Sequence, residues 1–527
     1  MNNKVGLSTL IFSSIGSIIG SGWLFGPAHA AAIAGPAAIF SWLLATFVIS
    51  IIALNLVEIS TTTPNKMSGM GYYLRYTHGA LASFLIEWSI LLSFISVVPS
   101  EATASTQYLS DLNFSWTHAL FNYQLQILTS SGLLFASGLC IIYFLINYYS
   151  LKFLANSINA ITLFKISVPI IVIISFLLVS FHSGNFHAIG DHSLTPYGIS
   201  SIFTATTTAG LVYAFNGFQN PISFAAEAKN PKRNIPLAII GSILICTIIY
   251  VLLQYVYLVS MPQHVLLTHG WNNLSFSSPF ASLALLLNIN LIALLIYTDA
   301  FISPAGTGLI FTAISARVLV GLAEHMPRVI GKVDKQSGLP KIHLIIVLLA
   351  SFIALWLLPS WNKLVSIVSV AFVISYAMVT VCTSSFRKLS PEKVHDQVIH
   401  IPFMHILSPL GFILATFMLY WSRWPLNGEV IILVLIGLPI YLYYAKKQNE
   451  PILLNVKKSL WIIIYLVVVA LFSYIGSSSF GGMNLIPDKI DHIILAILAL
   501  IFFYWGRSLS YKTQEYIDEI ESKRNSA

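Results

Sequence analysis

Charged residues are scarce in this sequence: aspartate, glutamate, lysine and arginine together make up 9% of its 527 residues. A soluble domain typically has about a quarter of its residues charged, because these side chains cover its surface. Apolar residues make up 57% of the chain. Runs of about 20 of them, long enough to cross the ~30 Å hydrocarbon core of a bilayer, recur along its whole length. The scarcity of charge excludes a soluble enzyme and a nucleic-acid-binding protein, and it predicts an all-α polytopic membrane protein.

Cysteine is also scarce, with three residues in the chain, Cys140, Cys246 and Cys382. All three lie inside apolar runs, so no pair is available outside the membrane to form a disulfide. No cluster of cysteine and histidine has the spacing of metal ligands. A secreted disulfide scaffold is thereby excluded, and we expect neither a metal nor another cofactor.

Fourteen apolar runs have the length and composition of membrane-spanning segments. They cover residues 7–31, 36–62, 81–110, 128–149, 157–181, 200–226, 235–260, 279–316, 341–359, 363–386, 405–424, 428–446, 459–477 and 490–508. The lipid bilayer is therefore the first partner that the sequence predicts.

Lysine and arginine are unevenly distributed between the loops that these runs leave. If the N-terminus is cytoplasmic, Lys363, Arg423 and Lys489 lie outside, Lys165 lies within a span, and the other 23 of the 27 basic residues are cytoplasmic. The positive-inside rule then predicts that both termini are cytoplasmic. The net charge of +8 reflects this topology and implies no nucleic-acid partner.

Two of the runs are interrupted by residues that form helices poorly. The first contains Ile18-Ile19-Gly20-Ser21-Gly22, and the sixth contains Phe215-Asn216-Gly217-Phe218. Backbone groups freed inside a membrane are tolerated only where protein buries them or where they line a cavity. Interruptions five spans apart indicate an inverted repeat whose two broken helices meet near the midplane and bind substrate there. The alternative is that these glycines only let helices pack closely.

The ends of such broken helices carry opposite partial charges. Unpaired amides at Gly20–Gly22 suit a carboxylate, and carbonyls at residues 214–216 suit an ammonium group. A zwitterion fits both, so we predict an amino acid substrate. Aromatic side chains beside the second break can close over the ligand or simply pack. The candidate substrate-binding residues are Ile19, Gly20, Ser21, Gly22, Tyr213, Phe215, Asn216, Gly217 and Gln219.

Three ionisable residues stand out within the predicted spans, and such groups mark functional sites because burying them in lipid is costly. Lys165, in the fifth span, can gain and lose a proton as access alternates; its alternatives are a fixed structural cation or a side chain that reaches the cytoplasmic surface. Asp299 lies midway along an unusually long eighth span, where it either pairs with Lys165 or caps a half-helix amide. Glu101, on the outer part of the third span, is predicted to face an external vestibule. Lys165 and Asp299 are the proton-coupling candidates.

Three stretches of this sequence resemble motifs of the amino acid–polyamine–organocation transporters. They are Ile18-Ile19-Gly20-Ser21-Gly22-Trp23-Leu24-Phe25, the stretch from Glu227 to Pro236 (EAKNPKRNIP), and Ser315-Ala316-Arg317 with Pro327 ten residues later. The resemblance implies a five-plus-five inverted-repeat fold of the leucine-transporter type. Proton-coupled members carry a lysine on the fifth helix. Several members carry an acidic residue where this sequence has Gln219, which cannot titrate, so proton coupling through that position is not expected here.

The resemblance also implies an organisation of the chain. Residues 1–226 hold the first repeat and the start of the second, and residues 227–386 hold the rest of the second repeat. Residues 387–446 hold two added helices, and residues 447–527 hold a further pair and a cytoplasmic tail. The number of spans is most similar to that of the bacterial aspartate–proton symporters, which implies a bacterial inner membrane.

The function that these observations predict is import of an amino acid by proton symport, with aspartate or glutamate favoured. A proton-independent amino acid exchanger, a neutral amino acid permease and a sensor without transport remain as alternatives. An enzyme is not expected, because no nucleophile and base are paired within the membrane. Replacing Lys165 discriminates symport from exchange.

Overall fold

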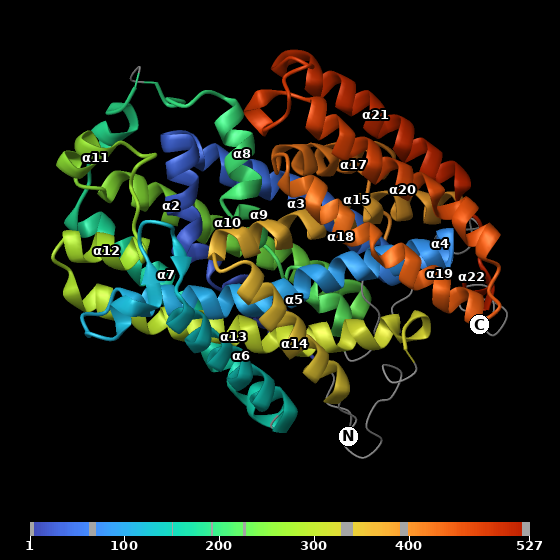
Figure 1. Ribbon diagram of the computed structural model, residues 1–527, viewed down its shortest axis with the longest axis horizontal. Helices are drawn as coiled ribbons and strands as arrows, with labels where there is room; N and C mark the ends of the chain where they lie inside the picture. Colours follow the sequence, from blue (N-terminus) through green and yellow to red (C-terminus); the bar gives the residue numbers. More distant parts are fainter. Residues whose placement is uncertain are drawn as a thin grey trace.

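The computed structural model describes residues 5–62, 70–149, 151–190, 193–224, 228–327, 341–389 and 399–518. Nearly all of its regular structure is helical (Figure 1), as expected of a chain that must satisfy its backbone hydrogen bonds within lipid. The helices are α1 (Leu7–Ile18), α2 (Gly22–Ala34), α3 (Ala38–Thr62), α4 (Tyr73–His78), α5 (Ala80–Ser110), α6 (Ser130–Tyr149), α7 (Leu151–Val179), α8 (Ser200–Thr208), α9 (Leu211–Ala214), α10 (Pro231–Ser260), α11 (Gln263–His269), α12 (Pro279–Leu286), α13 (Asn290–Leu322), α14 (Lys341–Leu357), α15 (Trp361–Leu389), α17 (Met404–Trp421), α18 (Leu426–Leu435), α19 (Gly437–Lys447), α20 (Ile452–Ile475), α21 (Asp488–Leu509) and α22 (Gln514–Tyr516).

Among the described residues, eleven helical segments are long and apolar enough to cross a membrane, and α1 and α14 are shorter apolar helices. Each of the fourteen runs predicted from the sequence overlaps at least one of the helices above. The prediction of an all-α polytopic membrane protein is confirmed. The grouping into repeats, with boundaries at residues 226, 386 and 446, stays a prediction.

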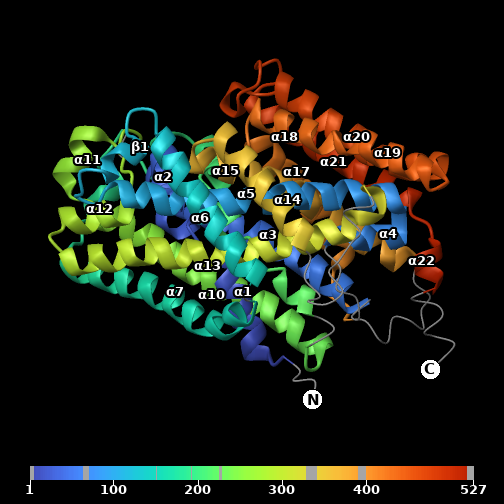
Figure 2. The ribbon, with the colours of Figure 1, turned by 60° about the horizontal axis from the view of Figure 1, so that its bottom comes forward.

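The bundle has two distinct ends, which Figures 1 and 2 show. At one end lie α11, α12 and a hairpin of two short strands, β1 (Phe121–Asn122) and β2 (Ile127–Leu128); we call it the hairpin end. At the other end lie α4 and α22; we call it the tail end. The long helix α5 runs between the two ends and packs against α13 and α15. Helices α20 and α21 lie along one side of the bundle, against α18 and α17.

The eighth predicted span is not one long helix. The structure divides it into α12 and α13 at Asn288, whose backbone is left-handed with a φ of 58°. Asparagine tolerates this conformation, which ends a helix. The prediction that Asp299 lies midway along one long segment is therefore wrong: it lies in the third turn of α13.

Both predicted helix interruptions are present. Helix α1 ends at Ile18, Ile19 is extended, and α2 begins at Gly22. In the sixth segment α8 ends at Thr208, the short α9 follows, and a turn with Gly217 at a φ of 114° precedes a 3-10 helix. A Cβ atom at Gly217 would lie 2.6 Å from the Cβ of Ser17, so only glycine lets the two breaks approach this closely.

Candidate functional site

Lys165 on α7 lies at the end of α1. Its Nζ donates to the carbonyl oxygen of Gly16 at 2.8 Å and to Oγ1 of Thr307 at 2.9 Å. The side chain is fully buried, and it runs across Gly306 of α13, where a Cβ would lie 2.9 Å from its Cε. An ammonium group at the C-terminal end of a half-helix complements the partial negative charge of the helix dipole. The alternative that Lys165 reaches the cytoplasmic surface is wrong.

Tyr250 on α10 joins the two breaks. Its hydroxyl lies 3.2 Å from the carbonyl oxygen of Ile18 and 2.9 Å from that of Ala214. It therefore contacts the carbonyl groups at which both half-helices end. Sequence reasoning missed this residue, because a tyrosine in an uninterrupted span carries no signal of its own.

The amides of the first break hold a carboxylate that belongs to the protein itself. Oε2 of Glu101, on α5, accepts a hydrogen bond of 2.9 Å from the backbone N–H of Ser21, and Oε1 accepts one of 2.6 Å from the hydroxyl of Tyr213. Ser100 Oγ also lies 2.9 Å from that hydroxyl. A Cβ at Gly20 would overlap Oε1 of Glu101. The predicted carboxylate-binding position is thus occupied by Glu101.

The expectation that Glu101 faces an external vestibule is wrong, because its side chain has no exposed surface. The reason is the rotation of α5, which turns this residue toward the first break. Ser21, Glu101, Lys165, Tyr213 and Thr307 form one set of contacts around Gly20. We call this set the break cluster.

Asp299 contacts neither of its predicted partners. Its Oδ2 accepts a hydrogen bond of 3.2 Å from Nε1 of Trp23, and its Oδ1 accepts one of 2.6 Å from Oγ of Ser303. Helices α7 and α13 do meet, but Lys165 hydrogen-bonds Gly16 and Thr307 instead. Both predictions for its contacts, pairing with Lys165 and capping a half-helix, are wrong.

Polar side chains at the second break bond one another. Nε2 of Gln219 donates to Oδ1 of Asn216 at 3.0 Å, and the N–H of Gly217 donates to Oε1 of Gln219 at 3.2 Å. Nδ2 of Asn216 is buried without a hydrogen-bond partner among the described residues. A buried amide donor left unpaired is costly, so Asn216 retains a donor for a ligand.

Phe215 is packed rather than poised over a ligand. Its ring is fully buried, edge-on to Tyr250 at 5.4 Å and to Trp42 at 6.1 Å. Phe218 similarly packs on Tyr376 at 5.7 Å. Of the aromatic residues predicted at this break, Tyr213 alone takes part in the break cluster.

Trp361, the first residue of α15, covers the first break from the hairpin end. Its Nε1 donates to Oγ of Ser21 at 2.8 Å. Its ring stacks on Phe25 at 4.6 Å and lies edge-on to Tyr213 at 6.0 Å. Sequence reasoning missed this residue as well, because Trp361 lies just before the tenth predicted run, residues 363–386, and nothing in its local sequence marks it as a neighbour of the first helix break.

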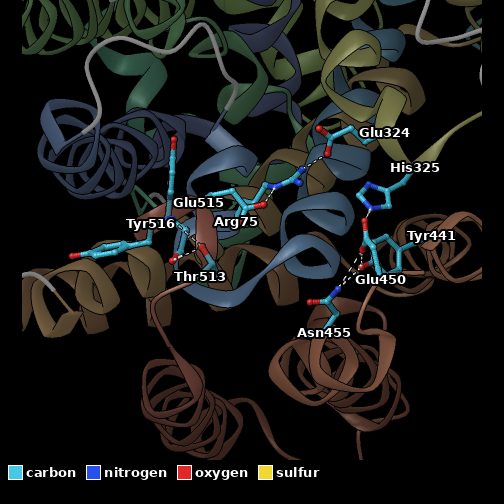
Figure 3. A network of polar contacts seen from close by, with 10 residues as sticks. Arg75, Glu324, His325, Tyr441, Glu450, Asn455, Thr513, Glu515 and Tyr516 are labelled. Carbon is cyan, nitrogen blue, oxygen red and sulfur yellow. Dashed lines mark hydrogen bonds and ion pairs between the residues drawn. The ribbon is translucent and has the colours of Figure 1, made fainter. Parts of the chain in front are cut away.

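A second group of polar contacts lies at the tail end and is drawn in Figure 3. Arg75 on α4 forms ion pairs with Glu324 and, at 2.8 Å, with Glu515 on α22. Burial by itself lowers the pKa of Arg75, but the hydrogen bonds and charges of Glu515 and Glu324 hold that pKa above its ordinary value. These contacts tie the tail to the helices of the bundle.

The same group continues through His325, which follows Glu324. Nε2 of His325 lies 2.7 Å from Oε1 of Glu450, and the hydroxyl of Tyr441 donates to Oε2 at 2.9 Å. Asn455 Nδ2 donates to the Tyr441 oxygen at 2.8 Å. Burial raises the pKa of Glu450, but the hydrogen bond and charge of His325 and the hydrogen bond from Tyr441 outweigh it, so that pKa is lowered. We call the seven residues from Arg75 to Glu515 the Arg75 network; they are Arg75, Glu324, His325, Tyr441, Glu450, Asn455 and Glu515.

A helical bundle with two broken helices, whose ends meet a buried lysine and a buried carboxylate, is the architecture of a secondary transporter. The family model described as "Amino acid permease" matches residues 5–445 of this chain. The chain belongs to this family of membrane transporters, and the predicted resemblance to the amino acid–polyamine–organocation transporters is confirmed. Of the second motif, Glu227 lies outside the described residues.

Three relatives with similar sequences are named as transporters of amino acids. The chain is 41% identical over 526 residues to the glutamate/serine transporter AimA of Bacillus subtilis (strain 168), covering 98% of this chain and 96% of that protein. It is 33% identical over 512 residues to the aspartate-proton symporter of the same organism, covering 96% of each. It is 26% identical over 470 residues to the serine/threonine exchanger SteT of that organism, covering 85% of this chain and 98% of that protein.

Proposed function

We propose that this protein imports an amino acid by proton symport across a bacterial inner membrane, with both termini in the cytoplasm and glutamate or aspartate as favoured substrates. The observation that carries the proposal is the carboxylate of Glu101 on the amide of Ser21 and the hydroxyl of Tyr213. This carboxylate lies where the helix break suits the carboxylate of an amino acid.

Glu101 and the substrate compete for the same donors. As a carboxylate, Glu101 accepts charge-assisted hydrogen bonds from Ser21 and Tyr213, which are stronger than those a neutral acid accepts. Protonation of Glu101 weakens its hydrogen bonds with Ser21 and Tyr213, so that the amide of Ser21 can bind the carboxylate of the substrate. Substrate and proton then favour the same state of the protein, which is the condition for coupling them.

Lys165 links the replacement of Glu101 by substrate to the movement of α1. Its ammonium holds the carbonyl of Gly16 in the last turn of α1, and its partner Thr307 also donates to the carbonyl of Ile19 at 3.3 Å. Loss of the proton from Lys165 removes the charge that complements the end of α1 and frees that half-helix to move. Asp299, hydrogen-bonded to Trp23 just after the break, is the second proton-coupling candidate.

The substrate is proposed from the chemistry of both breaks. Gly20, Ser21 and Gly22 receive the main-chain carboxylate, and the carbonyls from Tyr213 to Asn216 receive the ammonium. The unpartnered Nδ2 of Asn216 is a donor for a second carboxylate or a hydroxyl. Relatives named for glutamate, serine and aspartate transport support a small substrate with an acidic or hydroxyl side chain.

A neutral amino acid is the second candidate, favoured by the lack of arginine in the sequence of residues 200–226 and by the serine in one relative's name. Ile19, Gly217, Phe215 and Gln219 are proposed to shape either substrate's site. Of these, Ile19 and Gly217 act through backbone groups, Gln219 holds Asn216 in place, and Phe215 packs behind the break.

The test is uptake of labelled glutamate, aspartate and serine into proteoliposomes, with an inward proton gradient and after a protonophore collapses it. We expect accumulation of glutamate or aspartate only with the gradient. In Glu101→Gln, which keeps the shape but carries no charge, accumulation should fall to the level seen after collapse while exchange of internal for external substrate persists. Gradient-independent uptake by the wild type that requires internal amino acid would make the protein an exchanger. Unchanged gradient dependence in Glu101→Gln would remove Glu101 from the coupling.

A further inference from the structure

A cavity of about 300 Å³ lies at the hairpin end, directly outside Trp361. Its walls come from α2, α5, the β1–β2 hairpin and the first turn of α15. Trp361 is its floor, and the indole Nε1 of this residue donates to Oγ of Ser21. One layer of side chain therefore separates the cavity from the break cluster, which places it on the path from the hairpin end to the first break.

Six of the nine described residues that line this cavity are polar, and one of them carries a formal charge. Lys363 contributes the ammonium group, and none of the nine described residues that line the cavity is acidic. Asn362 and Lys363 lie in the first turn of α15, where the helix dipole adds partial positive charge. Both features favour an anion.

Two of the polar side chains in the lining, Gln107 and Gln126, are held by hydrogen bonds. Nε2 of Gln126 donates to Oγ of Ser275 at 3.1 Å, and Nε2 of Gln107 donates to the carbonyl of Ser277 at 3.0 Å. The hairpin is tied to the loop before α15 by a hydrogen bond of 2.8 Å from the N–H of Leu128 to the carbonyl of Pro359. These bonds fix Gln126 relative to Lys363.

His29 of α2 lies between the cavity and its floor. Its ring is 5.3 Å from that of Trp361, and its Nδ1 is buried with no hydrogen-bond partner among the described residues. Because this nitrogen has no accessible surface, His29 contributes its ring to the cavity wall and supports Trp361 from the side.

We propose that this cavity is an outer binding site for an amino acid of net negative charge, glutamate or aspartate, whose carboxylate Lys363 attracts. The ligand stays bound there until the hydrogen bond between Trp361 and Ser21 breaks and the movement of Trp361 exposes the first break. The site rests on the proposed transport function, and it makes Lys363 a determinant of specificity that acts before the substrate reaches the membrane interior. Because it acts through charge, salt should screen it.

The experiment measures initial rates of labelled L-glutamate and L-serine uptake by intact cells that express the wild type, Lys363→Gln or, as a matched control, Arg423→Gln. Arg423 is exposed and is absent from the cavity lining. In Lys363→Gln we expect the KM for glutamate to rise about threefold or more with its maximal rate unchanged, since a steering charge acts on encounter. The KM for serine should stay within about twofold, as an uncharged ligand feels little steering. Raising the salt concentration should increase the glutamate KM of the wild type and not that of Lys363→Gln.

The inference is overturned if Lys363→Gln leaves the KM for glutamate unchanged or raises the KM for glutamate and for serine equally. It is also overturned if Arg423→Gln raises the KM for glutamate as much as Lys363→Gln does. These outcomes leave the proposed transport function intact. Wild-type cells that take up neither amino acid above the empty-vector level refute the proposed function instead, and uptake of serine alone refutes both the acidic preference and this site.

Discussion

The break cluster and the Arg75 network both contain carboxylates, but they differ in the exposure of these groups and in how they stabilise them. Glu101 is fully buried, and the groups that donate hydrogen bonds to it, the N–H of Ser21 and the hydroxyl of Tyr213, carry no charge. Glu324 and Glu515 instead share the guanidinium of Arg75, and their side chains are 59% and 33% exposed. In the break cluster a buried carboxylate takes its hydrogen bonds from neutral donors, with the ammonium of Lys165 in the same cluster. In the Arg75 network partly exposed carboxylates pair directly with a guanidinium.

The difference indicates which carboxylates can change their protonation state. A carboxylate paired with arginine keeps its charge, because the guanidinium is always protonated. A carboxylate held by neutral donors in a dry interior has no such anchor, and its protonation depends on which ligands are present. The break cluster therefore suits a coupling device and the Arg75 network suits an attachment of the tail.

The largest expected effect comes from removing the charge of Lys165. Lys165→Ala leaves the carbonyl of Gly16 without its donor and removes the coupling group. Gradient-driven accumulation should fall about 5- to 150-fold, the range that a coupling free energy of about 1–3 kcal/mol produces. Exchange of internal for external substrate in the same proteoliposomes should continue. Accumulation at the wild-type level would show that Lys165 is a fixed structural cation.

A smaller effect is expected from adding one methyl group to the break. In Gly20→Ala the new Cβ overlaps Glu101 and lies 2.8 Å from Oγ1 of Thr307, so the break cluster must shift at a cost of about 1–3 kcal/mol. Uptake and thermal stability in detergent should both fall. Gly138→Ala is the control, because nothing lies within 4 Å of its Cβ position; equal behaviour of the two variants would refute the close packing at Gly20.

Breaking the Arg75 network should affect stability rather than transport. Arg75→Gln removes both ion pairs, and because the carboxylates are partly exposed the expected cost is about 0.2–1 kcal/mol. The melting temperature of the purified protein should drop slightly while the initial rate of uptake stays within about twofold. A loss of transport comparable with that of Lys165→Ala would show that the comparison between the two regions is wrong.

The smallest effect is a dependence of stability on pH through Glu450. Its pKa is lowered in the folded protein, so the stabilisation is complete above the ordinary value of 4.5 and is lost as the pH falls through the folded pKa. The difference in melting temperature between the wild type and Glu450→Gln should be constant near neutral pH and shrink below about pH 4.5. A difference that persists at pH 3 would mean that the carboxylate's charge does not contribute.

The features of the site that were predictable are those that depend on neighbouring residues. Gly20, Gly22 and Gly217 mark both breaks because glycine disfavours a helix wherever it stands. Lys165 stands out because a charge in an apolar run is costly in any packing arrangement. These local signals predict the two helix breaks and the buried lysine, and the structure shows all three.

The partners of these residues were not predictable. Glu101 and Ser21 are 80 positions apart, and Trp23 and Asp299 are 276 apart. Side chains of successive residues in a helix point in directions about 100° apart. Which residue contacts a neighbouring helix therefore depends on how each helix is rotated about its axis in the bundle. For that reason the sequence predicts Glu101 in an external vestibule and a direct pair of Asp299 with Lys165, whereas Glu101 is buried and Asp299 hydrogen-bonds Trp23 and Ser303.

The sequence by itself determined that this protein is a helical membrane transporter with two broken helices and one buried lysine. Hydropathy, glycine and isolated charge have the same physical consequence in every packing arrangement. Only the tertiary structure decided that Glu101 occupies the carboxylate position, that Trp361 covers it, and that Lys363 lies in a cavity beyond it. Those facts depend on helix rotation and crossing, which are set by the sum of many small packing contacts and by no single residue.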